Sequence, residues 1–115
     1  MSPWFDAVPA KKRPEFPAFR GHITAPLVVI GGGMAGCMTA YACAAAGLKV
    51  ILLEAGRIGQ GGTARASGFF DNESCASFRN LEASAGRRAA RAAFELSSPA
   101  PRELALTVKR LGIPA

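Results

Sequence analysis

The most constraining feature of this sequence is a glycine pattern, Gly31-x-Gly33-x-x-Gly36, that directly follows the apolar run Leu27–Ile30. The next residues, 37–46, are mostly small or apolar and have good helix propensity. A strand, a glycine turn and a helix in this order are typical of a dinucleotide-binding βαβ unit. We therefore predict a buried parallel strand over 27–30, a tight turn and a helix.

Each glycine of the pattern has its own physical reason. Gly31 can adopt the backbone angles of a tight turn, which a Cβ would disfavour. Gly33 has no side chain, so a pyrophosphate can approach the main chain, and Gly36 allows the helix to pack closely on the strand. The N–H groups of the first helical turn would then face the phosphates.

The residues that follow agree with this unit. Gly47 lies where a helix C-cap is expected. The run Lys49–Leu53 predicts a second strand, and Glu54 closes it at about the 20-residue spacing expected for the acid that binds a ribose. A glycine-rich turn in an ordinary α/β protein is the alternative at this point.

The remainder of the chain is less regular. Residues 55–68 form a second glycine-rich stretch, which is either a flexible loop or a second backbone cradle for a cofactor. Residues 69–79 suggest a loop with a short strand, and residues 81–97 have helical character. Ser98-Pro99 predicts the start of another helix, with serine as N-cap and proline at the first position, and Gly112 would end it.

Residues 1–25 form an arm that is rich in proline and aromatic residues. Proline at this density excludes a regular helix. The aromatic residues suggest an arm that docks on a folded body, whereas its place at a chain terminus fits disorder equally well.

The charge of +6 does not by itself indicate a nucleic-acid partner. Basic residues are spread along the chain, and no aromatic residues interleave with the cluster Arg87, Arg88 and Arg91. A solvated helix face is therefore the better interpretation. No segment approaches the roughly 18 apolar residues of a membrane-spanning helix, and the N-terminus lacks the apolar stretch of a signal peptide. We expect a cytoplasmic protein with neither a nucleic-acid nor a membrane partner.

Three cysteines are present, Cys37, Cys43 and Cys75, and none forms a C-x-x-C pair. We expect no metal site, and a sparse, odd count suits a reducing compartment. Cys37 would lie in the first turn of the predicted helix, where we interpret it as a small packing residue.

The combined motifs resemble those of the amine- and amino-acid-oxidising flavoproteins, a family that includes D-amino-acid oxidase, glycine oxidase, sarcosine oxidase and γ-glutamylputrescine oxidase. The resemblance rests on VVIGGGMAG (28–36), VILLEAGRIG (50–59) and GQGGTARASG (59–68). The last of these is similar to the family pattern G-x-G-A-T-G-R-N-A-G, but Ala64 and Ala66 replace its third Gly and its Asn. Pro99 and Pro101 interrupt a helical tail that is usually unbroken in the family.

The resemblance implies FAD as the cofactor and a set of residues that hold it. Gly31, Gly33 and the first helical turn would lie under the pyrophosphate, and Glu54 would take the ribose hydroxyls. The second glycine stretch would follow the cofactor toward the flavin, with Arg65 adding a charge near the phosphates. The implied cofactor-binding residues are Gly31, Gly33, Met34, Ala35, Gly36, Glu54, Ala55, Gly62, Thr63, Arg65, Ser67 and Gly68.

The predicted fold class is α/β: a partial Rossmann-like FAD-binding βαβ unit followed by a glycine-rich loop and helices. We divide the chain into the arm, 1–25, and the N-terminal part of an FAD-binding domain, 26–115. The substrate domain would be absent, so no catalytic residue is named, and further polypeptide or a second chain would complete the fold. The implied reaction is hydride transfer from a small amine or amino acid to flavin. The alternatives are an NAD-binding dehydrogenase module and a non-catalytic subunit with a vestigial nucleotide motif.

Overall fold

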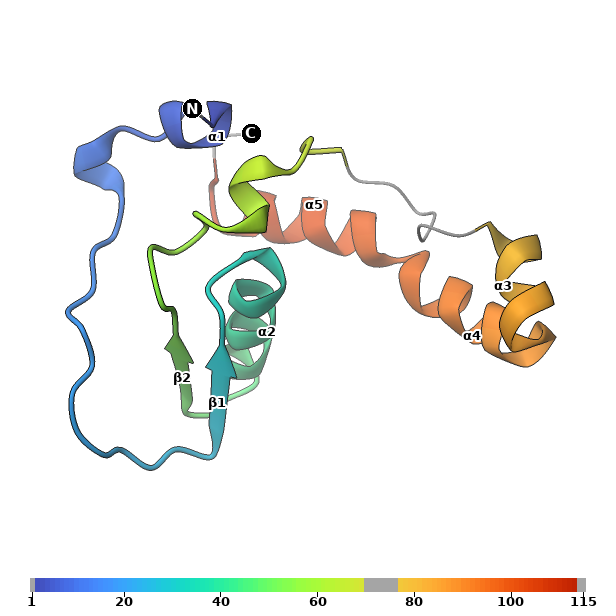
Figure 1. The fold of residues 1–115 in the computed structure, drawn as a ribbon, viewed down its shortest axis with the longest axis horizontal. Coiled ribbons are helices and arrows are strands. Elements are labelled where there is room, and N and C mark those ends of the chain that lie inside the picture. Colours follow the sequence, from blue (N-terminus) through green and yellow to red (C-terminus); the bar gives the residue numbers. More distant parts are fainter. Residues whose placement is uncertain (1, 70–76, 114–115) are drawn as a thin grey trace. The chain divides into compact units, whose positions relative to one another are not determined.

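The computed structural model describes residues 2–69 and 77–113. It divides into two compact units, Met1–Ser67 and Gly68–Ala115. The first unit contains α1 (Pro3–Asp6), the 3-10 turn η1 (Ala10–Lys12), β1 (Leu27–Ile30), α2 (Met34–Ala45), β2 (Val50–Leu53) and the 3-10 turn η2 (Gly62–Arg65). The second contains α3 (Phe78–Ala85), α4 (Arg87–Ser97) and α5 (Ala100–Arg110). Figure 1 shows these elements along the chain.

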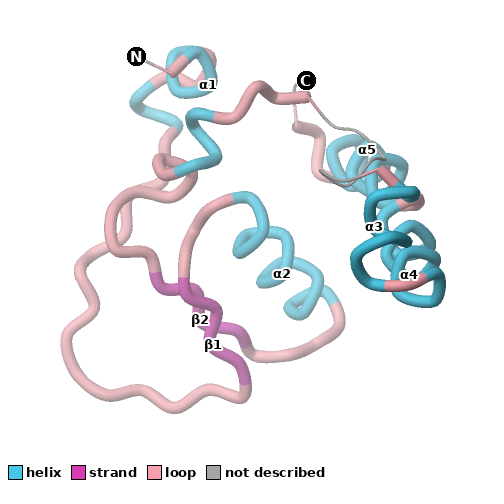
Figure 2. The backbone as a smooth tube through the Cα atoms, turned by 45° about the vertical axis from the view of Figure 1, so that its right-hand side comes forward, coloured by secondary structure: helices cyan, strands magenta, loops and turns pink. Residues whose placement is uncertain are grey.

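The two strands of the first unit form a parallel sheet, in which Leu27 pairs with Val50 and Ile30 with Leu53. Helix α2 connects the strands and packs beside them, as Figure 2 shows. This arrangement is a mixed α/β fold, and it is consistent with a partial Rossmann-like unit. The predicted positions of both strands are confirmed, although the second begins at Val50 rather than Lys49.

The prediction that the first strand is buried is wrong for one of its two faces. Leu27 and Val29 are half-buried, whereas Val28 is 45% exposed and Ile30 is 86% exposed. Successive side chains of a strand point to opposite faces, and a single helix within this unit covers only one of them. A parallel sheet normally has both faces covered, so Val28 and Ile30 leave an apolar surface open.

Helix α2 begins at Met34, so Cys37 lies in its first turn, as predicted. Its end agrees with the prediction, because Gly47 follows the C-cap residue with a φ of 87°. The N–H of Gly47 donates to the carbonyl of Ala44, and the N–H of Leu48 donates to the carbonyl of Cys43. This pair of bonds is the Schellman motif that glycine favours.

The second unit corrects the prediction of a single helix over 81–97. Gly86 adopts a φ of 83° and separates α3 from α4, which pack against each other. The rings of Phe78 and Phe94 meet edge to face with centroids 5.3 Å apart, and Ala90 is fully buried. A positive φ interrupts the hydrogen-bond ladder, so this glycine makes a helical hairpin from what the sequence suggested was one helix.

The predicted start of the last helix is also wrong, by one residue. Ser98 has helical backbone angles and is the C-cap of α4, while Pro99 is the N-cap of α5, which begins at Ala100. The predicted end is confirmed, because Gly112 follows the C-cap with a φ of 61°. The short strand suggested for 69–79 lies largely outside the described residues.

The predicted solvated face is confirmed for α4. Its three arginines are exposed, and Arg91 pairs with Glu95 one turn later at 2.8 Å. Among the residues that the structure describes, no helix is long and apolar enough to cross a membrane. The same residues include no group of three metal-binding side chains.

Candidate functional site

The turn after β1 has the geometry that its glycines predict. Gly31 adopts a φ of 101°, and its N–H donates to the carbonyl of Leu53 at 2.7 Å, which extends the parallel ladder. A Cβ on Gly36 would overlap the carbonyl oxygen of Gly31 and touch Val29. The close approach of helix to strand therefore requires glycine at position 36.

Gly32 is a residue that the motif itself does not single out, yet it has the most contacts in the turn. It is buried, and its N–H donates to Glu54 Oε2 at 2.6 Å. Its carbonyl accepts from the N–H of Gly59 at 2.8 Å and from Cys37 Sγ at 3.5 Å. A Cβ at this position would overlap the side chain of Ile58. The run of three consecutive glycines was the sequence signal for this position.

Glu54 joins the glycine turn to the loop after β2. Its Oε2 accepts from Gly32 and its Oε1 accepts from the N–H of Gly56 at 2.8 Å. These bonds lower the pKa of the Glu54 carboxyl, with Gly32 the main cause, then Gly56, and a smaller contribution from the N–H of Ala55. The carboxylate is exposed and has about four acceptor positions, so it can still accept bonds from ligand hydroxyls.

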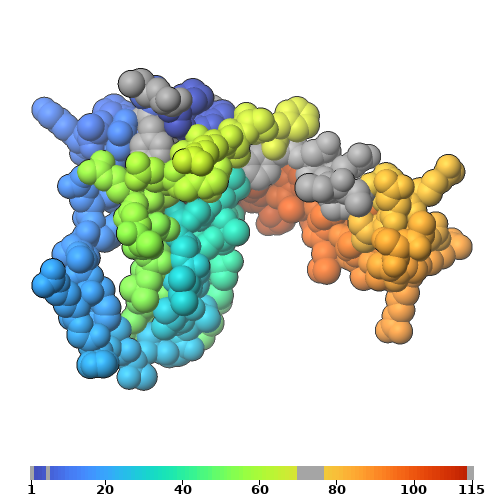
Figure 3. All heavy atoms as spheres, in the orientation of Figure 1, coloured from blue at the N-terminus to red at the C-terminus, as the bar shows by residue number. Residues whose placement is uncertain are grey.

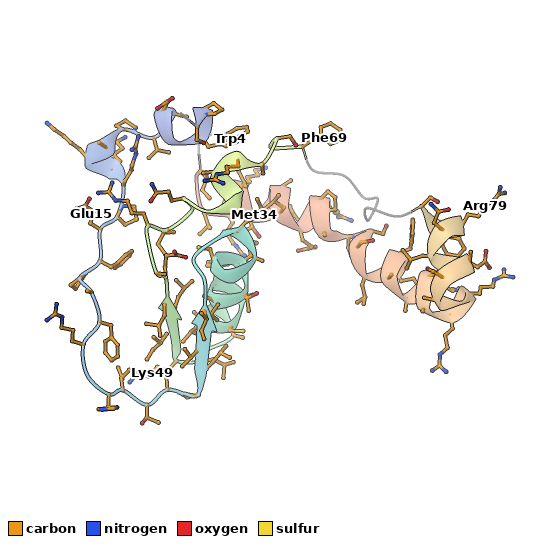
Figure 4. All side chains as sticks on the ribbon, in the orientation of Figure 1. Trp4, Glu15, Met34, Lys49, Phe69 and Arg79 are labelled. Atoms are coloured by element: carbon orange, nitrogen blue, oxygen red, sulfur yellow. The ribbon has the colours of Figure 1, made fainter. Side chains whose placement is uncertain are left out.

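The second glycine stretch contains a 3-10 turn, η2, where the sequence suggested no helix. Thr63 in this turn accepts a hydrogen bond from the N–H of Met34 at 2.9 Å. A Cβ on Gly33 would lie 3.1 Å from the same hydroxyl oxygen. The structure therefore brings Thr63 onto the first turn of α2, beside Gly33 and Met34. Figure 4 marks Met34 at this end of the helix.

The remaining predicted site residues lie in α2, in η2 or directly after η2. Ala35 lies in the same first turn of α2, where N–H groups have no carbonyl of their own helix to bond. Gly62 begins η2 and Arg65 ends it, with the Arg65 side chain exposed. Ser67 is the last residue of the first unit, and Gly68 opens the second with a φ of 77°.

The two alanines that depart from the family pattern have contacts with the N-terminal arm. Ala64 is 7% exposed, and its carbonyl accepts from Ser2 Oγ. The carbonyl of Ala66 accepts from Trp4 Nε1 at 2.8 Å. Sequence reasoning included Trp4 among the aromatic residues that suggested docking of the arm, but it identified neither Ser2 nor the two acceptors, because a bond to a main-chain carbonyl has no sequence signal at its acceptor.

The arm also differs from its prediction. Residues Pro3–Asp6 form a single helical turn, and proline is tolerated there as the first helical residue. Trp4 contacts η2, whereas Phe16 is 72% exposed and Phe19 is 54% exposed. Docking is thus a property of residues 2–6 rather than of all the aromatic residues in the arm.

The site therefore combines a glycine turn, the N-terminus of a helix, an ionised carboxylate and a hydroxyl. Backbone N–H groups at a helix N-terminus suit phosphates, and a carboxylate suits ribose hydroxyls. The donors and acceptors present fit a dinucleotide.

Comparison with known proteins agrees with this geometry. The model of the FAD-dependent oxidoreductase family matches residues 26–115. The chain is 32% identical over 99 residues to the probable oxidoreductase OrdL of Rhizobium meliloti (strain 1021), which covers 86% of this chain and 23% of that relative. It is 36% identical over 85 residues to the γ-glutamylputrescine oxidoreductase of Escherichia coli (strain K12), which covers 74% and 20%. The chain thus spans about a quarter or less of the length of these curated relatives. No solved structure matches it.

Proposed function

Because this chain belongs to the family of FAD-dependent oxidoreductases, we propose that its glycine turn, Glu54 and η2 together hold the adenosine and pyrophosphate of FAD. The observation that carries the proposal is that two separate elements meet at one turn. Glu54 bonds to Gly32, and Thr63 bonds to Met34. A structural turn needs no such convergence, whereas a binding site needs a rigid one.

The proposed roles follow from the chemistry of each group. The pyrophosphate lies against Gly31 and Gly33 and the N–H groups of the first turn of α2, where the helix dipole favours negative charge. Glu54, whose carboxylate is further stabilised by backbone N–H groups that lower its pKa, accepts from the ribose hydroxyls. Residues 62–68 follow the cofactor toward its flavin end, and the exposed guanidinium of Arg65 offsets phosphate charge.

Bound flavin would supply the acceptor for a hydride taken from the substrate. We propose an amine or an amino acid as that substrate, because the relative from Escherichia coli is a γ-glutamylputrescine oxidoreductase. None of the described residues is assigned a part in the reaction itself; their part is to bind and orient.

The open sheet face also belongs to this proposal. Val28 and Ile30 expose apolar surface that further polypeptide, from the same chain or another, would cover. We propose a cytoplasmic location for the assembled protein.

The direct test is the absorption spectrum of the purified protein, followed by titration of the nucleotide-free form with FAD and, separately, with NAD. We expect flavin absorption that is retained through gel filtration. Binding of NAD alone would make the chain a dehydrogenase module, and binding of neither nucleotide would mean that the motif is vestigial.

A further inference from the structure

Two side chains of the N-terminal arm bond to the backbone of the second glycine stretch. Ser2 Oγ donates to the carbonyl of Ala64, and Trp4 Nε1 donates to the carbonyl of Ala66 at 2.8 Å. Both bonds join residues 62 positions apart in the sequence. Figure 3 shows the atoms of the N-terminal residues beside those of this stretch, and Figure 4 marks Trp4 there.

The turn that the arm holds is the one that contacts α2. Thr63 accepts from the N–H of Met34, and the next residue, Ala64, is buried and bonded to Ser2. The contacts therefore run without a break from the arm, through η2, to the first turn of α2. Movement of the arm would remove both donors, Ser2 Oγ and Trp4 Nε1, that hold the carbonyls of Ala64 and Ala66 on that side.

The residues around η2 give it little support of their own. A Cβ on Gly61 or Gly62 would have no atom within 4 Å, so these glycines are not packed. Glycine also loses more conformational freedom on ordering than any other residue. Between the arm and the loop before η2, Glu15 pairs with Arg57 at 3.2 Å, but both side chains are exposed and such pairs contribute little.

We propose that residues Ser2–Asp6 are a latch that holds η2 on the N-terminus of α2, with Ser2 and Trp4 as positioning residues for the FAD site. This inference rests on the proposed function for its effect on FAD, but the latch itself is a property of the protein without cofactor. Ser2 and Trp4 act through Thr63 and the backbone of η2, which are the groups proposed to meet the cofactor.

Trp4 is proposed as a positioning residue because of its hydrogen bond rather than because of its burial. Its side chain is 47% exposed, so a large part of the indole packs against nothing. The indole N–H is a donor only, and its acceptor here is the carbonyl of Ala66. Trp4→Phe keeps an aromatic ring and removes the donor, and Ser2→Ala removes the hydroxyl, so this pair of changes isolates the two bonds.

The experiment compares the full chain with its Ser2→Ala/Trp4→Phe variant by amide hydrogen exchange, without FAD and then with it. We expect the amides of Met34 and of residues 62–66 to exchange about tenfold faster in the variant, since two hydrogen bonds are lost. The dissociation constant for FAD should rise by a similar factor. Phe16→Ala is the matched control, because it removes an aromatic side chain of the same arm that is 72% exposed. It should leave both measurements unchanged.

A further variant and an internal control distinguish a positioning role from general destabilisation of the chain. Ser2→Thr keeps a hydroxyl, so the Ser2→Thr/Trp4→Phe variant should exchange more slowly than Ser2→Ala/Trp4→Phe and match Trp4→Phe alone. Amides in the middle of α2 should exchange at the wild-type rate in every variant, whereas a generally destabilised chain would show faster exchange there too. If the double variant fails to fold, Trp4→Phe alone tests the latch, by amide exchange at Met34 and residues 62–66 and by the dissociation constant for FAD.

Unchanged exchange at Met34 and at residues 62–66 would overturn the latch. That outcome is distinct from failure of the proposed function, which would appear as a wild-type protein that binds no FAD. Exchange in the cofactor-free protein decides the latch in either case.

Discussion

The two glycine-rich segments of the first unit use glycine for different reasons. In residues 31–36, Gly36 has the carbonyl of Gly31 where a Cβ would be, and Gly32 is buried against Ile58. In residues 59–68, Gly61 and Gly62 have open space around the position of a Cβ. Close packing requires glycine at positions 32 and 36 of the first segment, whereas nothing packs against Gly61 and Gly62 of the second, whose backbone accepts hydrogen bonds from Ser2 and Trp4.

This difference explains why the glycine spacing predicted the geometry of the first segment but not that of the second. A turn held by main-chain packing must place glycine at fixed spacings, so its pattern specifies its geometry. A turn held by Thr63, Ser2 and Trp4 can keep the same geometry with alanine at positions 64 and 66, because the hydrogen bonds from the arm reach only their carbonyls. The variants below test the two halves of this comparison.

The largest effect is expected for Gly36→Ala. The new Cβ would overlap main-chain atoms of Gly31, so helix and strand would have to separate. We expect a loss of about 2–3 kcal/mol of stability or more in urea unfolding. Gly62→Ala is the matched change in the other segment and should cost less than about 0.5 kcal/mol, as surface substitutions usually do. Equal losses in the two variants would remove the distinction between the segments.

A smaller effect is expected for Glu54→Gln. The amide keeps one oxygen acceptor and loses the negative charge, so it cannot satisfy Gly32, Gly56 and a ribose together. The dissociation constant for FAD should rise about tenfold, since hydrogen bonds to charged groups are the stronger ones. Glu15→Gln, another exposed glutamate that pairs only with Arg57 among the contacts described, is the control and should leave the constant unchanged.

Thr63→Val tests the contact between the two segments themselves. Valine keeps the shape of threonine and removes the hydroxyl that accepts from Met34. Loss of a capping acceptor costs about 1 kcal/mol, which corresponds to roughly fivefold weaker FAD binding if the cofactor needs the ordered turn. Thr39→Val, at an exposed position on α2, is the control for the substitution itself. If both variants bind FAD like the wild type, the Thr63 hydroxyl does not contribute to the FAD site.

Much of the fold was predictable because local chemistry decides it. The strand Leu27–Ile30, the turn at Gly31 and the glycine after α2 follow from apolar runs and special backbone angles. The break at Gly86 was missed because a glycine within a helical pattern can either continue the helix or end it, and here the contact of Phe78 with Phe94 favours a hairpin. The exposure of Ile30 depends on what covers the sheet, which no local pattern encodes.

The residues of the candidate site also fall into those that the sequence predicted and those that it did not. Gly31, Gly36 and Glu54 were predicted from spacing, and the structure brings them to one turn. Ser2 and the acceptors of Ser2 and Trp4 were missed because those acceptors are main-chain carbonyls that any residue could supply.

The smallest effect concerns pH. The pKa of Glu54 lies below its ordinary value of about 4.3 because backbone N–H groups stabilise the carboxylate. A lowered folded-state pKa means that the stabilisation is present above the unfolded pKa and is lost as the pH falls through the folded one. The difference in unfolding free energy between wild type and Glu54→Gln should therefore be constant near neutral pH and shrink below about pH 4. A difference that stays constant to pH 3 would mean that the carboxylate does not bond to Gly32 and Gly56 in solution.

The central claim is that both glycine segments and Glu54 meet a single FAD molecule. The most direct measurement is amide hydrogen exchange of the protein with and without saturating FAD. The account predicts that FAD slows exchange in residues 31–36, 54–56 and 62–66 together, with the same dependence on FAD concentration for all three. Slower exchange in residues 31–36 alone, or in none of the three segments while FAD remains bound, would contradict it.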